Sequence, residues 1–324
     1  MILVTGGTGL IGTALLRALA AKGRAVRVFS RQAEAPKHLR SFSNLQWMQG
    51  DIEDFQGLED ALEGIDEVYH VAGLVSFDAK DRDRLKRINV EGTANVVNAC
   101  LYKGVRKLVY VSSVAALGKS IESKPIHEKT EWEDSANNSA YALSKMLAER
   151  EVWRGFEEGL QVAIVNPTIV IGYAENDPWQ SSSSFFPMIK KGLKFYTNGV
   201  NGFVGAEDIA SVLIQLMESE VNGERFVLSA DNHSYREVFT WIAHAIGAPA
   251  PSIEVKPWMS GLAWRFFAVA KYFGVKPLVT KETTRSALMR SVYDSRKVQE
   301  VLGFQFTPIQ SVIKKIAQEH FGAQ

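Results

Sequence analysis

The first twelve residues, Met1-Ile2-Leu3-Val4-Thr5-Gly6-Gly7-Thr8-Gly9-Leu10-Ile11-Gly12, decide the fold of this chain. Residues 2–4 form an apolar run without polar alternation, which is typical of a parallel strand that is covered on both faces. A helical pattern of apolar residues follows the glycines and stops at Gly23. Strand, glycine turn and helix together predict a cradle for a pyrophosphate. Gly6 would permit the tight turn, Gly9 would let the backbone approach the phosphates, and Gly12 would let the helix pack closely on the strand.

Composition narrows the class of protein. The chain has 324 residues, enough for one large and one smaller domain, and its 46% of apolar residues can fill a sizeable core. The formal net charge of +1 leaves no electrostatic footprint for nucleic acid. The single cysteine, Cys100, excludes an internal disulfide and is expected in the core. We find no signal peptide, no run of membrane-spanning length and no metal-ligand cluster, so a cytoplasmic protein is expected.

Further strands and helices are expected in alternation after the first unit. Short apolar runs predict the strands, and helical spacing of apolar residues predicts long helices at residues 81–103 and 139–158, with another at 234–247. The expected strands cover residues 25–29, 45–49, 67–71, 107–111, 160–165 and 225–229. This order predicts an α/β fold, a doubly wound parallel Rossmann sheet with a smaller mixed α/β region. Residues 1–172 would bind the dinucleotide, residues 173–324 would mainly bind substrate, and residues 203–230 would return to the first domain.

The end of the second strand indicates which dinucleotide is bound. An acidic residue about 20 positions after the glycines would bind the ribose 2′-hydroxyl and favour NAD. This chain has Ser30-Arg31 there, and an arginine can pair with the 2′-phosphate of NADP. The sequence therefore favours NADP, with NAD as the alternative if Arg31 is only a solvated charge.

Candidate catalytic residues lie on the predicted fifth strand and on the helix at residues 139–158. Ser112 and Ser113 follow the strand at the carboxyl edge of the sheet, where ligands bind. Tyr141 and Lys145 stand four residues apart and therefore share a helix face. A lysine ammonium beside a phenol favours the phenolate and is expected to lower the pKa of the tyrosine.

These motifs together resemble the extended branch of the short-chain dehydrogenases/reductases, the NAD-dependent epimerase/dehydratase family. The resemblance rests on the glycine spacing, on Asn89-Val90-Glu91-Gly92-Thr93, on Asn166-Pro167-Thr168-Ile169-Val170-Ile171-Gly172, and on residues 293–304. It implies that Ser113, Tyr141 and Lys145 are the catalytic residues, with Lys145 also holding the nicotinamide ribose. Asn89 and His70 are expected to be structural.

The same resemblance implies the residues that contact the dinucleotide. Asp51 would accept a hydrogen bond from the adenine amine and Ile52 would pack on its ring, although Asp51 is also placed to cap the next helix. Ala72 and Gly73 would let the chain pass close to the cofactor, and Pro167 would lie under the nicotinamide. The complete predicted set is Gly6, Thr8, Gly9, Leu10, Ile11, Gly12, Arg31, Asp51, Ile52, Ala72, Gly73, Tyr141, Lys145 and Pro167.

Three functions are weighed from these residues. The favoured one is an NADP(H)-dependent oxidoreductase that reduces a carbonyl or oxidises a secondary alcohol, similar to dihydroflavonol reductases and 3β-hydroxysteroid dehydrogenases. A nucleotide-sugar epimerase with tightly bound NAD is the alternative, and a dinucleotide sensor without turnover is a third. The aromatic residues at 258–274 would belong to the core, to a lid over an apolar small-molecule substrate, or to a membrane-contacting surface. The resemblance also implies a homodimer formed by the helices at 81–103 and 139–158.

Overall fold

The computed structural model describes residues 1–118, 124–135, 138–174, 177, 181–256 and 287–322. The aromatic stretch at 258–274 lies outside the described residues. None of the described helices is long and apolar enough to cross a membrane.

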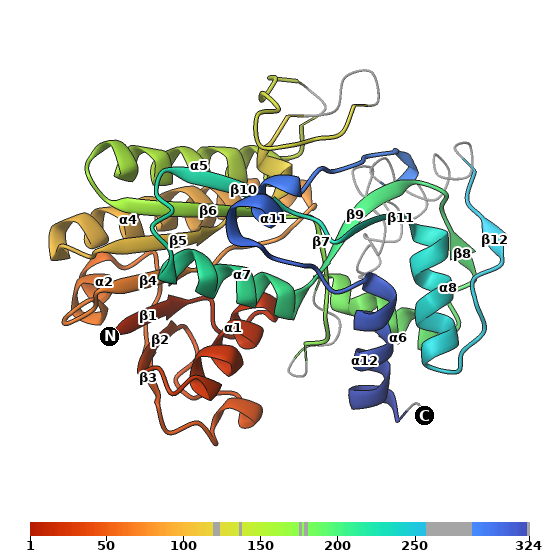
Figure 1. Cartoon of the computed structure of the whole chain (residues 1–324), viewed down its shortest axis with the longest axis horizontal. Helices are drawn as coiled ribbons and strands as arrows, with labels where there is room; N and C mark the ends of the chain where they lie inside the picture. The colour runs from red at the N-terminus through yellow and green to blue at the C-terminus, as the bar shows by residue number, and fades with distance from the viewer. Residues whose placement is uncertain (119–123, 136–137, 175–176, 178–180, 257–286, 323–324) are drawn as a thin grey trace.

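A seven-stranded parallel sheet forms the centre of the larger part of the molecule (Figure 1). Its strand order is β10-β6-β5-β4-β1-β2-β3, so the chain winds outward from β1 in both directions. The bounds are β1 (Ile2–Thr5), β2 (Val26–Ser30), β3 (Leu45–Gln49), β4 (Glu67–His70), β5 (Lys107–Val111), β6 (Gln161–Pro167) and β10 (Glu224–Leu228). The doubly wound α/β fold predicted from the sequence is confirmed.

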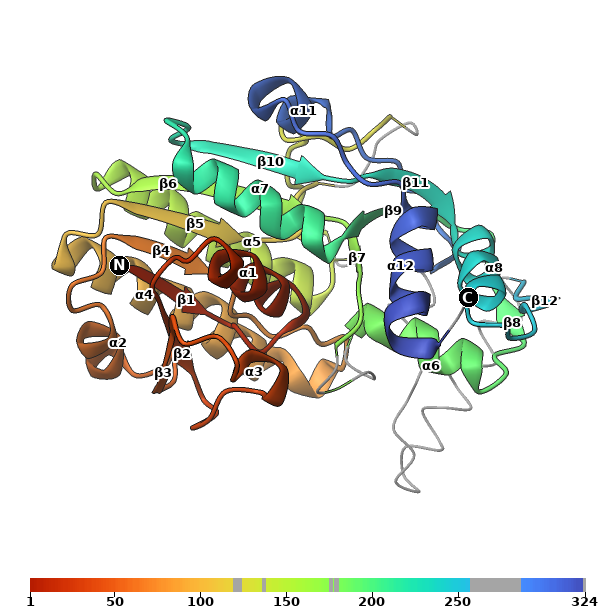
Figure 2. The ribbon, with the colours of Figure 1, turned by 60° about the horizontal axis from the view of Figure 1, so that its bottom comes forward.

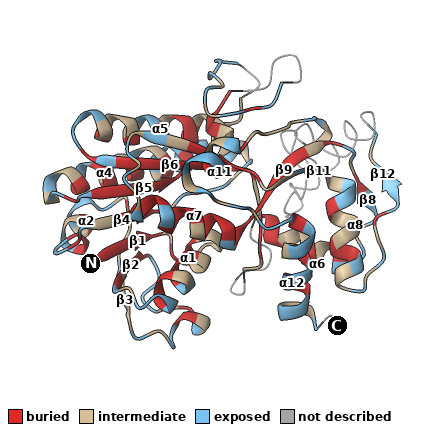
Figure 3. Ribbon diagram, viewed as in Figure 1, coloured by how far each residue is buried: buried red, intermediate tan, exposed pale blue. Residues whose placement is uncertain are grey.

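Helices cover both faces of this sheet, which explains the continuous apolar runs in its strands (Figures 1 and 2). One face packs on α1 (Leu10–Ala21) and α7 (Ala206–Glu218), and the other on α2 (Phe55–Ala61), α4 (Gly92–Lys103) and α5 (Ala140–Glu157). Alternate strand residues serve the two cores: Val109 faces α1 and α7, whereas Leu108 and Tyr110 face α4 and α5. Most of these strands are buried in Figure 3, whereas the edge strand β3 has intermediate and exposed residues.

A smaller region follows β6 and contains its own mixed sheet, in the order β11-β9-β7. Its apolar core includes Phe186, Phe203 and Ile313. The elements are β7 (Ile169–Ile171), α6 (Phe185–Lys190), β8 (Phe195–Tyr196), β9 (Val200–Gly205), β11 (Asp231–Ser234), α8 (Tyr235–Ala245), β12 (Ile253–Glu254) and α12 (Ile309–Phe321). Within residues 203–230, α7 and β10 pack in the larger part, whereas β9 pairs in the smaller sheet.

The helix expected at residues 81–103 is present but changes its winding midway. It begins as α3 (Arg82–Leu85), passes through a π-helical segment at Lys86–Glu91, and continues as α4. The π segment contains Asn89, whose side chain leaves the helix to bind the turn after β4. Such local widening is common at functional sites.

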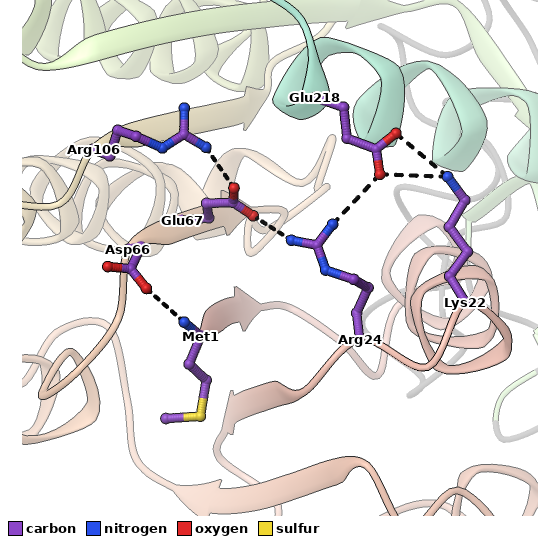
Figure 4. Close-up of polar contacts among 7 residues, drawn as sticks. All are labelled: Met1, Lys22, Arg24, Asp66, Glu67, Arg106 and Glu218. Atoms are coloured by element: carbon purple, nitrogen blue, oxygen red, sulfur yellow. Dashed lines mark hydrogen bonds and ion pairs between the residues drawn. The ribbon is translucent and has the colours of Figure 1, made fainter.

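An ion-pair network joins several elements at the amino-terminal edge of the sheet (Figure 4). Glu67, at the start of β4, accepts from Arg24 at 2.9 Å and also from Arg106. Arg24 also reaches Glu218 at the end of α7 at 3.4 Å. Most of these side chains are partly exposed, so each pair contributes little by itself.

Lys107, the first residue of β5, lies at this edge and is completely buried although it carries a charge. Its Nζ donates to the carbonyl oxygens of Leu216 at 2.6 Å and Ser219 at 2.7 Å. These carbonyls lie at the end of α7, where a cation also complements the helix dipole. Lys107 therefore attaches α7 to the sheet.

We expect Lys107→Met to lower the free energy of unfolding by about 2 kcal/mol, because one buried and one partly buried carbonyl group lose a charged donor. Lys22→Met is the control, since Lys22 is exposed and pairs with Glu218 at 3.4 Å. Urea unfolding measures both variants. Equal losses in the two variants would contradict this role of Lys107.

Candidate active site

The glycine turn after β1 has the shape expected of a pyrophosphate cradle. Gly6 has a φ of +72°, and a Cβ on it would lie 2.4 Å from the Ala72 nitrogen. A Cβ on Gly12 would lie 2.1 Å from the Gly6 carbonyl oxygen, so only glycine allows α1 to pack this closely. A Cβ on Gly9 would make an ordinary contact with the Gly6 carbonyl oxygen at 3.5 Å, so the fold itself does not require glycine at this position.

The amino terminus of α1 follows directly after Gly9. Gly9 is its N-cap residue and has no side chain to occupy the first backbone N–H groups, which include those of Leu10 and Ile11. Thr8 is half-buried beside them, and the Ile11 side chain packs against the core below. Leu10 and Ile11 can therefore serve an anion only through their backbone, as helix N-termini do.

The helix after β3 has a different aspartate at its N-cap position from the one considered in the sequence. Asp54, not Asp51, is the N-cap residue of α2. The Asp51 carboxylate accepts from the Glu53 nitrogen at 3.1 Å in a turn, because three further residues precede the helix. The capping role considered for Asp51 was therefore wrong. Ile52 is 6% exposed and packs on Gly92, so only a small part of it remains for a ligand.

Arg31 directly follows β2 and is exposed. Arg27, on the same strand, is already engaged, because its guanidinium donates to the carbonyls of Ala61 and Glu63 at 2.7 and 2.9 Å. An open hollow of about 720 Å³ lies next to Arg31 along the chain, and its lining includes Lys37 and Arg40.

The turn after β4 is held in place by Asn89. Its Oδ1 accepts from the Leu74 nitrogen at 2.7 Å, and its Nδ2 donates to the Leu74 carbonyl at 3.0 Å and to Ser144 at 2.9 Å. Ala72 and Gly73 lie in this turn, and a Cβ on Gly73 would be 3.7 Å from the Lys145 Nζ. Asn89 is structural, as the sequence predicted.

The three candidate catalytic residues meet at the carboxyl ends of β5 and β6. Ser113 follows β5, and its hydroxyl accepts from the Ala115 nitrogen at 3.1 Å. Tyr141 and Lys145 lie on the first turns of α5, which begins at Ser139, the N-cap residue. Burial raises the pKa of Tyr141, and a hydrogen bond with Ser113 partly offsets this effect.

Lys145 lies under the site and is 4% exposed. Its Nζ donates to the Tyr110 hydroxyl at 2.8 Å and to the Val111 carbonyl at 2.9 Å. Burial lowers the pKa of Lys145 to about 7, while the Glu149 carboxylate acts in the opposite direction. The expected lowering of the Tyr141 pKa was wrong for this structure, because burial of the phenol outweighs the groups that favour its phenolate.

A buried carboxylate that the sequence reasoning missed stands one helical turn beyond Lys145. Glu149 receives hydrogen bonds from Arg225 at 3.0 Å and from Asn166 at 2.8 Å. Asn166 also donates to the carbonyl oxygen of Ser113 at 3.1 Å. The spacing Tyr141-x-x-x-Lys145-x-x-x-Glu149 places all three on one helix face and is the signal that was available.

His70 is unsuited to act as a general base. It is fully buried at the end of β4, and its ring nitrogens bond to Thr5 at 2.7 Å and to Thr93 at 3.0 Å. Burial, together with the charge of Lys145, lowers the pKa of His70 to about 3. The ring is therefore neutral at physiological pH and structural, as predicted.

Comparison with known families now identifies the group to which this site belongs. Residues 2–229 match the model of the NAD dependent epimerase/dehydratase family. The chain belongs to this family. It is an NAD(P)-dependent enzyme of the extended short-chain dehydrogenase/reductase type.

The similar sequences carry reductase and demethylase names, and a similar fold occurs in a solved epimerase. A putative dihydroflavonol 4-reductase from Synechocystis sp. is 28% identical over 315 residues, covering 96% of this chain and 91% of the relative. Sterol demethylase protein B from Methylococcus capsulatus is 30% identical over 264 residues, covering 81% and 79%. The UDP-glucose 4-epimerase of Thermus thermophilus, solved with NAD, superposes with a TM-score of 0.78 at 22% identity, covering 99% of this chain and 98% of the epimerase.

Two glycine substitutions test the cradle of this epimerase/dehydratase family member. Gly12→Ala should lower the melting temperature by several degrees, because its Cβ clashes with the backbone at Gly6. Gly9→Ala should leave the melting temperature nearly unchanged and weaken dinucleotide binding at least tenfold, because its Cβ makes no clash within the protein but would stand where the pyrophosphate is expected to approach the backbone. Calorimetry measures both quantities. Unchanged binding by Gly9→Ala would place the dinucleotide elsewhere.

Proposed function

We propose that this protein is an NADP(H)-dependent oxidoreductase that reduces the carbonyl of a small molecule, or oxidises the corresponding secondary alcohol. One observation carries the proposal: the Ser113 side chain lies close enough to Tyr141 to act on the pKa of its phenol, and Lys145 follows one helical turn further along, at the same edge of the sheet as the glycine cradle. Open parallel sheets bind their ligands at this edge.

Each of the three side chains has a distinct role in the proposed reaction. A carbonyl oxygen that gains negative charge would accept a hydrogen bond from Ser113, and Tyr141 would supply the proton. Burial raises the pKa of Tyr141, so the phenol is protonated at neutral pH and has a proton to donate. When bound, a reduced nicotinamide supplies the hydride. Lys145, fixed by Tyr110 and Val111, would hold the ribose and favour the phenolate after proton transfer.

The Tyr141→Phe variant should lose at least a hundredfold in kcat, because the ring then has no proton to donate. Its affinity for NADP⁺ should change less than threefold, since the cradle and Arg31 are untouched. A panel of ketones and aldehydes with NADPH measures turnover, and titration calorimetry measures binding. Wild-type turnover by this variant would refute the proposed function.

Arg31 supports the choice of NADP. It is exposed after β2, whereas Arg27 is already bound to two carbonyl groups. Lys37 adds positive charge to the adjacent hollow, while Arg40 pairs with Glu34 at 2.6 Å. A 2′-phosphate beside Arg31 would therefore meet a donor that can bind it through two hydrogen bonds.

We expect Arg31→Ala to weaken NADPH binding about tenfold or more and NADH binding less than twofold, because only NADPH carries the 2′-phosphate. Arg150→Ala, an exposed arginine of α5, is the control and should change neither constant. Fluorescence titration gives all the dissociation constants. Equal losses for the two dinucleotides would overturn the assignment of Arg31.

Two exposed apolar side chains favour an apolar substrate. Phe77 packs edge-on against Tyr141, with ring centroids 5.6 Å apart, and remains 39% exposed. Val75, on the same loop after β4, is 50% exposed. A substrate carbonyl that reaches Tyr141 would thus pass beside apolar surface. The homodimer expected through α4 and α5 stays a prediction.

A further inference from the structure

A second tyrosine, Tyr110 of β5, contacts the candidate catalytic lysine from below. Tyr110 is fully buried, and its hydroxyl accepts the hydrogen bond from the Lys145 Nζ at 2.8 Å. The ammonium also lies 4.6 Å from the centroid of the Tyr110 ring. The sequence alone does not indicate a role of Tyr110 in the site. Tyr110 lies inside a buried strand, and it does not belong to the Tyr141/Lys145 spacing.

Tyr110 connects Lys145 to a longer chain of buried hydrogen bonds. Thr93 of α4 lies close enough to the Tyr110 hydroxyl to act on its pKa, and Thr93 bonds to His70 at 3.0 Å. His70 in turn bonds to Thr5 at 2.7 Å, and its ring stacks on the ring of Tyr110 with centroids 5.3 Å apart. This series of polar contacts therefore runs from Lys145 to Thr5, the residue that precedes Gly6. It lies beneath the position expected for the dinucleotide.

One orientation of the hydrogen atoms satisfies every polar group in this series of contacts. Lys145 can only donate, so the Tyr110 oxygen accepts and its O–H is free to donate to Thr93. Thr93 then donates to Nε2 of His70, and the Nδ1–H of His70 donates to Thr5. This orientation requires a neutral His70, which agrees with its lowered pKa of about 3. His70 is thus a neutral ring that accepts at Nε2 and donates from Nδ1.

The positions of two Lys145 donors are fixed by this arrangement. Tyr110 and the Val111 carbonyl each accept one N–H, which leaves the third for a ligand on the side of Gly73. We propose that Tyr110 is a positioning residue that holds the Lys145 ammonium in place for the dinucleotide and for Tyr141. This inference rests on the proposed function of Lys145, because Tyr110 acts only through it.

Removal of the Tyr110 hydroxyl has a predictable effect on the titration of Lys145. The groups that act on Lys145 are Glu149 from α5, Tyr110 from β5 and His70 from β4. Arg225 of β10 lies beyond Glu149, and Tyr141 precedes Lys145 by four residues on the same helix face. Tyr110→Phe takes away an acceptor that stabilises the ammonium, so the lysine should lose its proton at a lower pH. A ligand that needs the ammonium then binds weakly at a pH where the wild-type protein still binds it.

The test compares Tyr110→Phe with Tyr69→Phe. Tyr69 is a matched control because it is equally buried, on the neighbouring strand β4, but faces the opposite core and does not contact Lys145. Calorimetry between pH 5 and 9 gives the pH midpoint at which NADP⁺ affinity falls. The 2′-phosphate titrates alike in all variants, so differences between them report on the protein.

We expect Tyr110→Phe to move this midpoint down by about one pH unit and to lower kcat about tenfold, as the loss of one hydrogen bond to a charged group implies. Tyr69→Phe should leave both unchanged. If Tyr110→Phe does not fold, Thr93→Val replaces it in the test. This substitution removes the hydroxyl beside Tyr110, which is one residue further from Lys145, so the midpoint should move in the same direction by a smaller amount.

The possible failures can be distinguished. If Tyr141→Phe is inactive but Tyr110→Phe matches Tyr69→Phe in midpoint and kcat, Tyr110 is not a positioning residue and the proposed function stands. If Tyr141→Phe keeps wild-type turnover, the proposed function itself fails. A lower melting temperature of Tyr110→Phe with an unmoved midpoint shows a purely structural role and overturns the inference.

Discussion

The parallel pairing of β1 with β2 and β4 is the constraint on which the rest of the molecule depends. Because all seven strands of the sheet run the same way, every loop that leaves a carboxyl end arrives at one edge. The glycine turn, the Ala72–Gly73 turn and Ser113 become neighbours through this geometry alone. The opposite edge holds the ion pairs of Figure 4. The candidate ligand site and the ion pairs that join the elements of the fold therefore lie at opposite ends of the strands.

Burial under the binding edge imposes a second condition, since polar groups there need partners within the protein. His70 and Asn89 meet this condition in different ways. His70 stays neutral between two threonines, whereas Asn89 binds both backbone groups of Leu74 and leaves its helix with a π-helical segment. Both residues shape the cofactor side of the sheet without reaching its surface. Their chemistry is structural, although their residue types also occur in catalytic sites.

The sequence predicted most of the central sheet, because two-sided burial leaves continuous apolar runs that are easy to recognise. It also predicted that Tyr141 and Lys145 lie four residues apart on one helix, since helical spacing is a local property. It could not predict Lys107, whose charge suggests an exposed strand end until α7, more than 100 residues later, supplies two carbonyl groups. The contact of Arg225 with Glu149 is equally non-local. The strand order of the smaller sheet could not be predicted either, because β9 pairs with β7, which precedes it in the sequence, and with β11, which follows it.

The last segment of the chain has a consequence for how the protein is made. Val298 of α11 (Arg296–Leu302) is fully buried in the same core as α1 and α7, and Lys297 donates to the Arg225 carbonyl on β10 at 2.8 Å. A ribosome that adds ~5–20 residues per second needs roughly 15 to 60 s to proceed from β1 to this helix. Throughout that interval the nascent dinucleotide-binding sheet lacks part of its covering and exposes apolar surface. The order of synthesis thus delays completion of the first core until nearly the whole chain has emerged, which makes the growing polypeptide a natural client for chaperones.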